Sequence, residues 1–162
     1  MCQTYQFDLP HRIIPGGAQR FHSVKNGLDA IEGEGLVAVH DAARPLISTE
    51  LIHQSYMEAA IKGNCIVGVT PIDSLRKINE SQESRAINRN EFILVQTPQI
   101  FLTNVLKQCY QVPFREEFTD DASVVEFSGH AIHIIKGERE NIKLTYPEDL
   151  EIAEILLHKK GR

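Results

Sequence analysis

Apolar runs alternate with amphipathic stretches along the chain, a pattern typical of an α/β fold. The clearest strand is predicted at 36–39, where an unbroken apolar run fits a strand buried on both faces. A similar run predicts a strand at 65–69. The amphipathic stretch 49–61 between them predicts a helix with Ser48 as its N-cap. Together these elements predict a β-α-β unit.

The rest of the chain adds further elements of both kinds. We expect strands at 92–95 and 132–135, and helices at 104–110 and 120–127. Thr119 fits the N-cap of the last of these helices. Thr145, with Glu148 three residues later, fits a capping box that opens a final helix. No repeat or linker divides the sequence, so residues 1–162 are predicted to form one domain.

Residues 73–90 form a polar segment with few candidates for a core. Two short alternating stretches, 74–78 and 85–87, flank a turn-like cluster at 79–83. This pattern predicts a β-hairpin arm that projects from the domain. Because an isolated hairpin is marginally stable in water, we expect the arm to pack on a second copy of the chain. An ordinary solvated hairpin is the alternative interpretation.

Composition restricts the classes of function. The net charge of −5 argues against a broad nucleic-acid surface, and no apolar stretch approaches the length of a membrane span. We therefore expect a cytoplasmic protein with neither a nucleic-acid nor a membrane partner. Cys2, Cys65 and Cys109 are odd in number and far apart, which predicts reduced thiols rather than a disulfide framework or a zinc site.

The most informative motif, His40-Asp41-Ala42-Ala43-Arg44-Pro45, directly follows the first strand. Ligands of open α/β sheets lie outside the carboxyl ends of strands. Asp41 could hold Mg²⁺, Arg44 could bind a phosphate, and the small Ala42 would let a nucleotide approach the backbone. An Asp that caps a turn and an Arg paired with a surface acid are the alternative.

Three other segments contain candidate binding residues. Paired glycines at 16–17 precede a predicted helix that contains Ser23 and extends to about Ile31. Thr97 would present its hydroxyl at the end of a strand that Pro98 is expected to terminate. Lys143 lies between apolar neighbours and could neutralise a phosphate. Taken singly, each segment also fits a structural turn or cap.

These motifs in this order resemble the 2-C-methyl-D-erythritol 4-phosphate cytidylyltransferase family. The matching segments are GGxxRxxSV at 16–24, VHDAARP at 39–45, NR at 88–89, TPQ at 97–99, TDDAS at 119–123 and NIKLT at 141–145. The resemblance runs from about Ile13 to Leu157. It implies a Rossmann-like nucleotidyltransferase domain, a homodimer joined through the arm, and Mg²⁺-dependent cytidylyl transfer from CTP to methylerythritol phosphate. A ribitol-phosphate cytidylyltransferase and a non-catalytic dimeric module are the alternatives.

The resemblance also assigns roles to individual residues. On the nucleotide side it implies base and ribose contacts by Gly17 and Ser23, with Ala42 nearby. Asp41 is implied as the catalytic and metal-binding carboxylate, and Lys143 as the lysine on the reacting phosphates. Contacts with methylerythritol phosphate are implied for Arg44, Thr97 and Thr119, and across the dimer for Ser74 and Arg89.

Two departures from the family pattern are visible. Ala18 follows the paired glycines, where the family often has an acidic residue. The family also begins with a strand and a glycine-rich loop that contains an essential Arg, with a Lys shortly after; that part would precede Met1. We therefore expect the first β-α-β unit to be missing, and this chain alone to have little activity.

Overall fold

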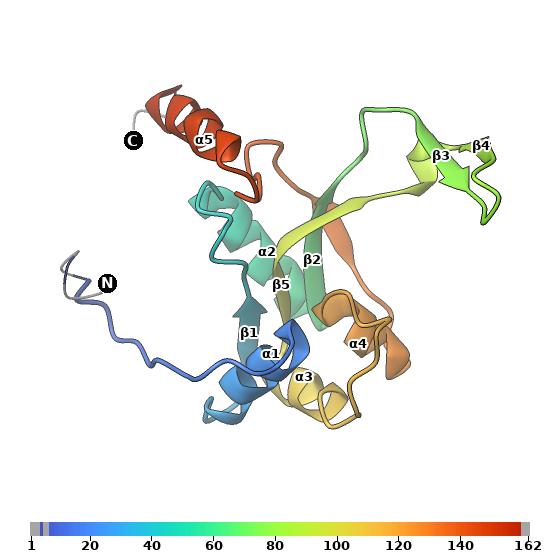
Figure 1. The fold of residues 1–162 in the computed structure, drawn as a ribbon. Coiled ribbons are helices and arrows are strands. Elements are labelled where there is room, and N and C mark those ends of the chain that lie inside the picture. Colours follow the sequence, from blue (N-terminus) through green and yellow to red (C-terminus); the bar gives the residue numbers. More distant parts are fainter. Residues whose placement is uncertain (1–3, 5–6, 160–162) are drawn as a thin grey trace.

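A four-stranded sheet forms the centre of the computed structural model, which describes residue 4 and residues 7–159 (Figure 1). The strand order is β1 (Leu36–Val39), β5 (Leu94–Leu102), β2 (Asn64–Val69) and β6 (Ile134–Lys136). The long strand β5 is antiparallel to both of its neighbours, and β6 is parallel to β2. The mixed sheet with its helices confirms the α/β prediction.

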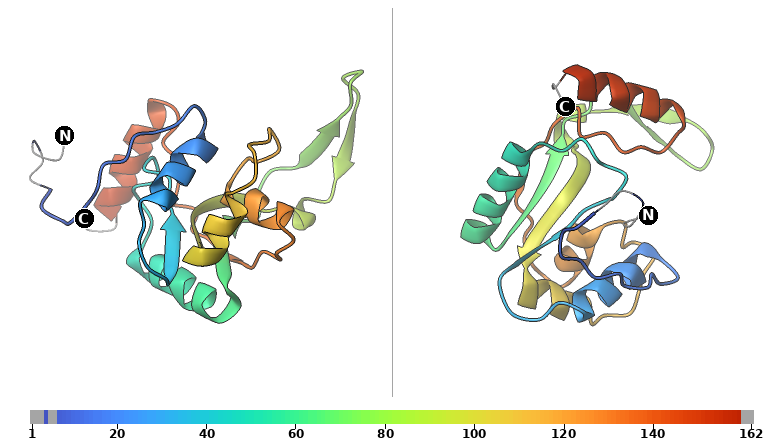
Figure 2. Two further views of the ribbon diagram at one scale, coloured as in Figure 1. Left: turned by 90° about the horizontal axis from the view of Figure 1, so that it is seen from below. Right: turned by 90° about the vertical axis from the view of Figure 1, so that its left-hand side faces the viewer.

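Helices cover both faces of this sheet (Figure 2). One face packs on α2 (Thr49–Lys62); the other packs on α1 (Arg20–Asp29), α3 (Thr103–Cys109) and α4 (Asp121–Phe127). Strand β1 shows the alternation clearly, because Val37 and Val39 pack on the larger cluster and Leu36 and Ala38 on the α2 side. The prediction of full burial is wrong, however, because β1 lies at the edge of the sheet and all four of its residues are only half-buried.

The predicted hairpin arm is present and projects away from the sheet (Figure 2). Its strands β3 (Leu75–Ile78) and β4 (Ser84–Ile87) pair antiparallel, and the short 3₁₀ helix η1 (Arg89–Glu91) follows at the base. The turn is closed by Asn79, whose side-chain oxygen accepts a hydrogen bond from the Glu83 amide at 2.9 Å. Dimerisation through the arm stays a prediction.

The β-α-β unit differs from the prediction in one respect. Helix α2 begins as expected, since Ser48 caps it by accepting a hydrogen bond from the Leu51 amide at 3.0 Å. Strands β1 and β2 run parallel, but β5 lies between them and pairs with both. A strand distant in sequence therefore completes the unit, which a local pattern could not predict.

The prediction that Pro98 ends its strand is wrong, as are the bounds 92–95. Strand β5 begins at Leu94 and continues past the proline to Leu102. The reason is a bulge: Ile66 pairs with Gln99 and Val67 with Gln96, so Thr97 and Pro98 face no residue of β2. Since Pro98 lies outside the ladder, its missing N–H removes no hydrogen bond from the sheet.

The start of α4 is also shifted from the predicted cap. Asp120, rather than Thr119, is the N-cap, because its carboxylate accepts a hydrogen bond from the Ser123 amide at 2.9 Å. The Ser123 hydroxyl in turn bonds the Asp120 backbone, which completes a capping box. Thr119 is left outside the helix, with its side chain available to the adjacent cavity.

The capping box predicted for the final helix is likewise wrong. Helix α5 (Glu148–Lys159) is preceded by a turn in which Asp149, rather than Thr145, supplies the acceptor. Its carboxylate accepts hydrogen bonds from the Thr145 and Tyr146 amides at 2.7 and 2.8 Å. These bonds from Tyr146 and Thr145 lower the pKa of Asp149.

Several other element boundaries differ from the sequence pattern by one or two residues. Strand β6 begins only at Ile134, because the His133 amide donates to the side chain of Asn64 instead of entering the ladder. Helix α1 begins at Arg20, after the paired glycines, and ends at Asp29, two residues before the predicted end.

Cys65 and Cys109 are buried free thiols, and burial raises the pKa of Cys65 to about 11. Cys2 lies outside the described residues. Among the residues that the structure describes, no helix is long and apolar enough to cross a membrane.

Candidate active site

Asp41 is surrounded by three cationic side chains just beyond the end of β1. Its Oδ2 lies 3.3 Å from Lys143 Nζ and 3.4 Å from Arg44 Nε, and its Oδ1 lies 3.9 Å from Arg20 Nε. The Asp41 side chain is only 17% exposed, whereas Lys143 is 51% exposed. One shielded carboxylate therefore orients cations that come from three separate segments.

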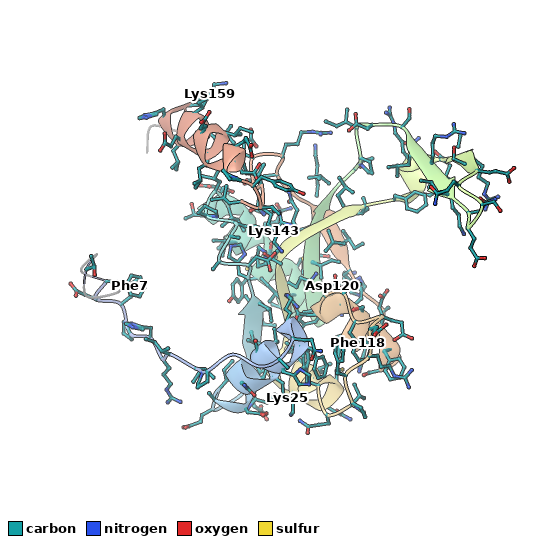
Figure 3. All side chains as sticks on the ribbon, viewed as in Figure 1. Phe7, Lys25, Phe118, Asp120, Lys143 and Lys159 are labelled. Atoms are coloured by element: carbon teal, nitrogen blue, oxygen red, sulfur yellow. The ribbon has the colours of Figure 1, made fainter. Side chains whose placement is uncertain are left out.

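These charges line a cavity of about 260 Å³ over the sheet. Among its lining residues are Arg20, Asp41, Arg44, Thr97, Thr119 and Lys143. Figure 3 shows Lys143 and Asp120 near the middle of the molecule, between α5 and α4. The structure thus brings together five residues that the sequence singled out, and adds Arg20. Three cations and the two carboxylates Asp41 and Asp120 give the lining a positive balance.

Asn141 fixes the loop that carries Lys143. This fully buried residue donates from its side-chain Nδ2 to the Thr97 carbonyl at 2.9 Å. Its own carbonyl accepts a hydrogen bond from Arg44 Nη1 at 2.8 Å. A backbone bond from the Leu144 amide to the Ala43 carbonyl, 2.8 Å long, closes the contact between the two loops. Lys143 is therefore held beside Asp41 by backbone anchors on both sides.

The bulge in β5 makes Thr97 available to this site. Its side-chain Oγ1 accepts a hydrogen bond from the Asp41 amide at 2.9 Å and lies 3.1 Å from His40 Nδ1. The His40 Nε2 atom lies 3.0 Å from the Arg44 carbonyl. Thr97 is 5% exposed, so this network joins a nearly buried strand residue to the loop 40–44.

Arg20 is a site residue that the sequence analysis missed. It forms two hydrogen bonds with the fully buried Asp121, of 3.0 and 2.6 Å, and Asp121 also accepts a 2.6 Å bond from the Tyr110 hydroxyl. Burial alone would lower the pKa of Arg20, but its hydrogen bond and attraction to Asp121 outweigh burial, so the pKa is raised. Burial, followed by the charge of Asp121, raises the pKa of Tyr110.

A signal for this pair was present in the sequence. Arg20 and Asp121 each belong to one of the recognised motifs, and their opposite charges are complementary. A second anchor acts beside it: the buried Gln99 donates to Asp120 Oδ2 at 2.8 Å and accepts from the Ala122 amide at 2.9 Å. Both anchors fix the start of α4, which places Thr119 at the cavity.

The residues expected at the nucleotide lie on a neighbouring surface. Gly17 donates from its amide to the Ser23 hydroxyl at 2.9 Å, and neither lines the Asp41 cavity. A Cβ atom on Gly17 would lie 2.2 Å from the Cβ of His22, so only glycine allows this close approach. Ala42 is exposed in the loop between Asp41 and Arg44.

The two arm residues are also separate from the cavity. Ser74 is exposed next to β3, and Arg89 donates from its guanidinium to the Ile72 carbonyl at the base of the arm. Neither lines the Asp41 cavity of their own chain. A contribution of these side chains to another subunit stays a prediction.

Known proteins resemble this chain over nearly its whole length. A profile of the family described as IspD, 2-C-methyl-D-erythritol 4-phosphate cytidylyltransferase, matches residues 3–159. The cytidylyltransferase of Phocaeicola vulgatus is 48% identical over 97% of this chain and 71% of its own length, and that of Bacillus licheniformis is 38% identical over 100% and 71%.

Solved structures of such enzymes share the fold. The 4-diphosphocytidyl-2C-methyl-D-erythritol synthase of Anaerococcus prevotii superposes with a TM-score of 0.84 at 28% identity, over 95% of this chain and 70% of its own. The cytidylyltransferase of Thermus thermophilus gives 0.79 at 31%, over 93% and 77%. With the family profile covering nearly the whole sequence, this chain belongs to the 2-C-methyl-D-erythritol 4-phosphate cytidylyltransferase family.

Proposed function

We propose that the Asp41 cavity binds 2-C-methyl-D-erythritol 4-phosphate and that the protein transfers a cytidylyl group to it from CTP. In this reaction a phosphate oxygen of the acceptor attacks the α-phosphorus of CTP. The bond from that phosphorus to the bridging oxygen of the β-phosphate breaks, and pyrophosphate leaves. Positioning and neutralisation of charge account for most of the catalysis in such transfers.

The observation that carries the proposal is the convergence of Arg20, Arg44 and Lys143 on one carboxylate in a small cavity. A phosphate monoester brings about two negative charges at neutral pH. Arg44 and Lys143 offer such an anion positive charge and hydrogen-bond donors in the lining, whereas the charge of Arg20 is largely compensated by Asp121. Asp41 keeps the cations apart and oriented until the phosphate arrives, which lowers the cost of organising them during the reaction.

The two predicted phosphate ligands are suited to different roles. Arg44 is 12% exposed and tied to both Asp41 and the Asn141 carbonyl, so its planar group is fixed for acceptor binding. Lys143 is half exposed and holds a single ion pair with Asp41. Its ammonium can turn toward the phosphates as negative charge develops there, which is the behaviour expected of a catalytic lysine.

A divalent cation fits this site only as part of the nucleotide complex. The residues described in the structure contain no cluster of three or more His, Cys, Asp or Glu side chains that could hold a metal. Asp41 could provide one carboxylate, and Mg²⁺ is commonly bound through one or two carboxylates together with substrate phosphates. We therefore propose that Mg²⁺ arrives with CTP and that Asp41 is its protein ligand. The ion would neutralise charge on the phosphate oxygens.

We also propose a cytoplasmic homodimer that is joined through the arm, in which Ser74 and Arg89 contact the acceptor of the other subunit. The support is the exposure of large apolar side chains around the base of the arm. Ile72, Phe92, Ile93 and Leu94 are 62%, 41%, 41% and 54% exposed. Such a cluster is costly in water and is typical of a surface that a partner covers.

Calorimetry and a pyrophosphate-release assay together test the proposed function. The chain should bind methylerythritol 4-phosphate more tightly than ribitol 5-phosphate, and pyrophosphate release should require CTP, Mg²⁺ and the acceptor. Binding is measured first, because it depends on neither CTP nor turnover. Arg44→Ala should weaken acceptor binding, whereas Lys25→Ala, a surface lysine of α1 outside the cavity, should not. Absence of acceptor binding or a preference for ribitol phosphate would overturn the proposal.

A further inference from the structure

Both ring nitrogens of His40 lie within hydrogen-bond distance of groups in the site. Its Nε2 lies 3.0 Å from the Arg44 carbonyl oxygen, and its Nδ1 lies 3.1 Å from Thr97 Oγ1. The Thr97 oxygen also accepts a hydrogen bond from the Asp41 amide. A continuous chain of hydrogen bonds therefore runs from the Asp41 amide through Thr97 and His40 to the Arg44 carbonyl.

The Arg44 carbonyl and the Asp41 amide, at the two ends of this series of hydrogen bonds, determine which group donates in each bond. A carbonyl oxygen only accepts, so the Nε2 of His40 must carry a proton to bond Arg44. In the neutral imidazole the other nitrogen, Nδ1, is then an acceptor. The contact with Thr97 must therefore be a donation from the threonine hydroxyl to His40. At the other end, the Asp41 amide only donates, which is consistent with Thr97 as its acceptor.

We propose that His40 is a positioning residue that fixes the hydroxyl proton of Thr97, so that Thr97 offers the cavity an acceptor and not a donor. A hydroxyl has one proton and two acceptor sites. His40 takes the proton and the Asp41 amide takes one acceptor site, which leaves one lone pair. That lone pair accepts a hydrogen bond from a substrate hydroxyl and is unfavourable beside a phosphate oxygen. It directs the polyol end of the acceptor toward Thr97 and leaves the phosphate to Arg44 and Lys143.

This inference rests on the proposed function for its substrate, but its structural part is tested without any ligand. Nitrogen-detected NMR of the histidine rings, at about pH 9 where imidazole is neutral, reports which nitrogen carries the proton. The His40 signals, assigned by their loss in His40→Asn, should show the tautomer with the proton on Nε2. Thr97→Val should keep the proton on Nε2, because the Arg44 carbonyl still requires it, but should shift the Nδ1 signal, which loses its hydrogen bond. Thr97→Ser should leave that signal unchanged. A proton on Nδ1 in the unsubstituted protein would overturn the proposal.

A pair of substitutions at His40 then tests the consequence for binding. Gln at position 40 can keep the donor near Nε2 but loses the acceptor for Thr97, whereas Asn can keep a group near Nδ1. Loss of an aligned hydrogen bond is worth about a factor of ten in affinity. His40→Gln should therefore weaken methylerythritol phosphate binding about ten-fold, more than His40→Asn does, and raise KM more than it lowers kcat.

Two controls separate this inference from the proposed function. In a Thr97→Val background the His40→Gln change should have little further effect, because the hydroxyl it positions is absent. His53→Gln on the exposed side of α2 should change nothing. Equal losses for His40→Gln with and without the Thr97 hydroxyl would refute the role of His40. If the unsubstituted protein binds no acceptor at all, the proposed function fails, while the tautomer still decides the role of His40.

Discussion

Arg20 and Asp121 form a two-armed ion pair that joins the start of α1 to the start of α4, 101 residues apart in the sequence. Asp121 is fully buried, and the exposed part of Arg20 faces the cavity, where its Nε lies 3.9 Å from Asp41. The pair therefore connects the helix that follows Gly17 with the helix that places Thr119. Its two hydrogen bonds give this connection a defined orientation.

Removing one member of this pair should destabilise the protein. Arg20→Met leaves the buried carboxylate of Asp121 without its cation, and we expect a loss of about 3 kcal/mol in the free energy of unfolding, measured by urea denaturation. The exposed pair between Lys25 and Asp29 on the same helix is a matched control, because Lys25→Met should cost less than about 1 kcal/mol. Equal costs for the two changes would show that Arg20 does not stabilise Asp121.

Shortening the arm should produce a monomer. Arg76 pairs with Ala86 in the hairpin, so residues 77–85 can be replaced by Asn-Gly, which forms a tight two-residue turn between paired positions. The variant should fold and sediment as a monomer, whereas the unchanged protein should sediment as a dimer. Met57→Glu on the exposed side of α2 should leave the dimer intact. A dimer that persists without the arm would assign the interface to another surface.

Arg89 and Lys143 should serve one composite site from different subunits. Arg89 lies at the base of the arm, and Lys143 lies beside Asp41 on the core. In an enzyme restored to the length of its relatives, mixing Arg89→Ala with Lys143→Ala should place both lesions in one site of the heterodimer and leave the other intact. Pyrophosphate release should recover to about half of the unsubstituted value per heterodimer, by the two-fold symmetry. No recovery after verified subunit exchange would place both residues in the same chain's site.

The first turn of α5 should depend on pH through Asp149. Hydrogen bonds from the Tyr146 and Thr145 amides lower the pKa of this carboxyl in the folded protein. Its contribution is therefore present above the ordinary carboxyl pKa of about 4 and is lost as pH falls through the lowered value. The protection of the Thr145 and Tyr146 amides against exchange, taken relative to their intrinsic rates at each pH, should fall on acidification. Asp149→Asn keeps an oxygen acceptor without a titration, so the same acid response in that variant would contradict the assignment.

Local patterns predicted those elements whose stability is local. The run at 36–39, the Ser48 cap and the hairpin turn at 79–83 all form where the sequence indicated, because neighbouring residues satisfy one another there. The proximity of Asp41 and Arg44 could also be predicted, since both residues directly follow the same strand. The family motifs extended this to Thr97, Thr119 and Lys143, which line the same cavity although they are distant in sequence.

The errors occur where a distant partner decides the local structure. Asp120 replaces Thr119 as the cap of α4 because the distant Gln99 holds its carboxylate. The turn before α5 is a local exception, in which Asp149, four residues after Thr145, accepts the amide hydrogen bonds. Neither arrangement is visible in the spacing of residues. The extension of β5 past Pro98 depends on the register of β2, which sequence periodicity does not report.

The bulge in β5 contains two unpaired residues, and the even number has a consequence for how this site can change. Side chains alternate between the faces of a sheet, so a shift of one residue would turn every following side chain from the core to the opposite face. A shift of two leaves that alternation intact, and Phe101 stays in the core on the far side of the bulge. Substitutions at Thr97 and Pro98 also disturb no residue pair between β5 and β2. The chemistry of the cavity can vary at these positions while the sheet beneath it remains the same.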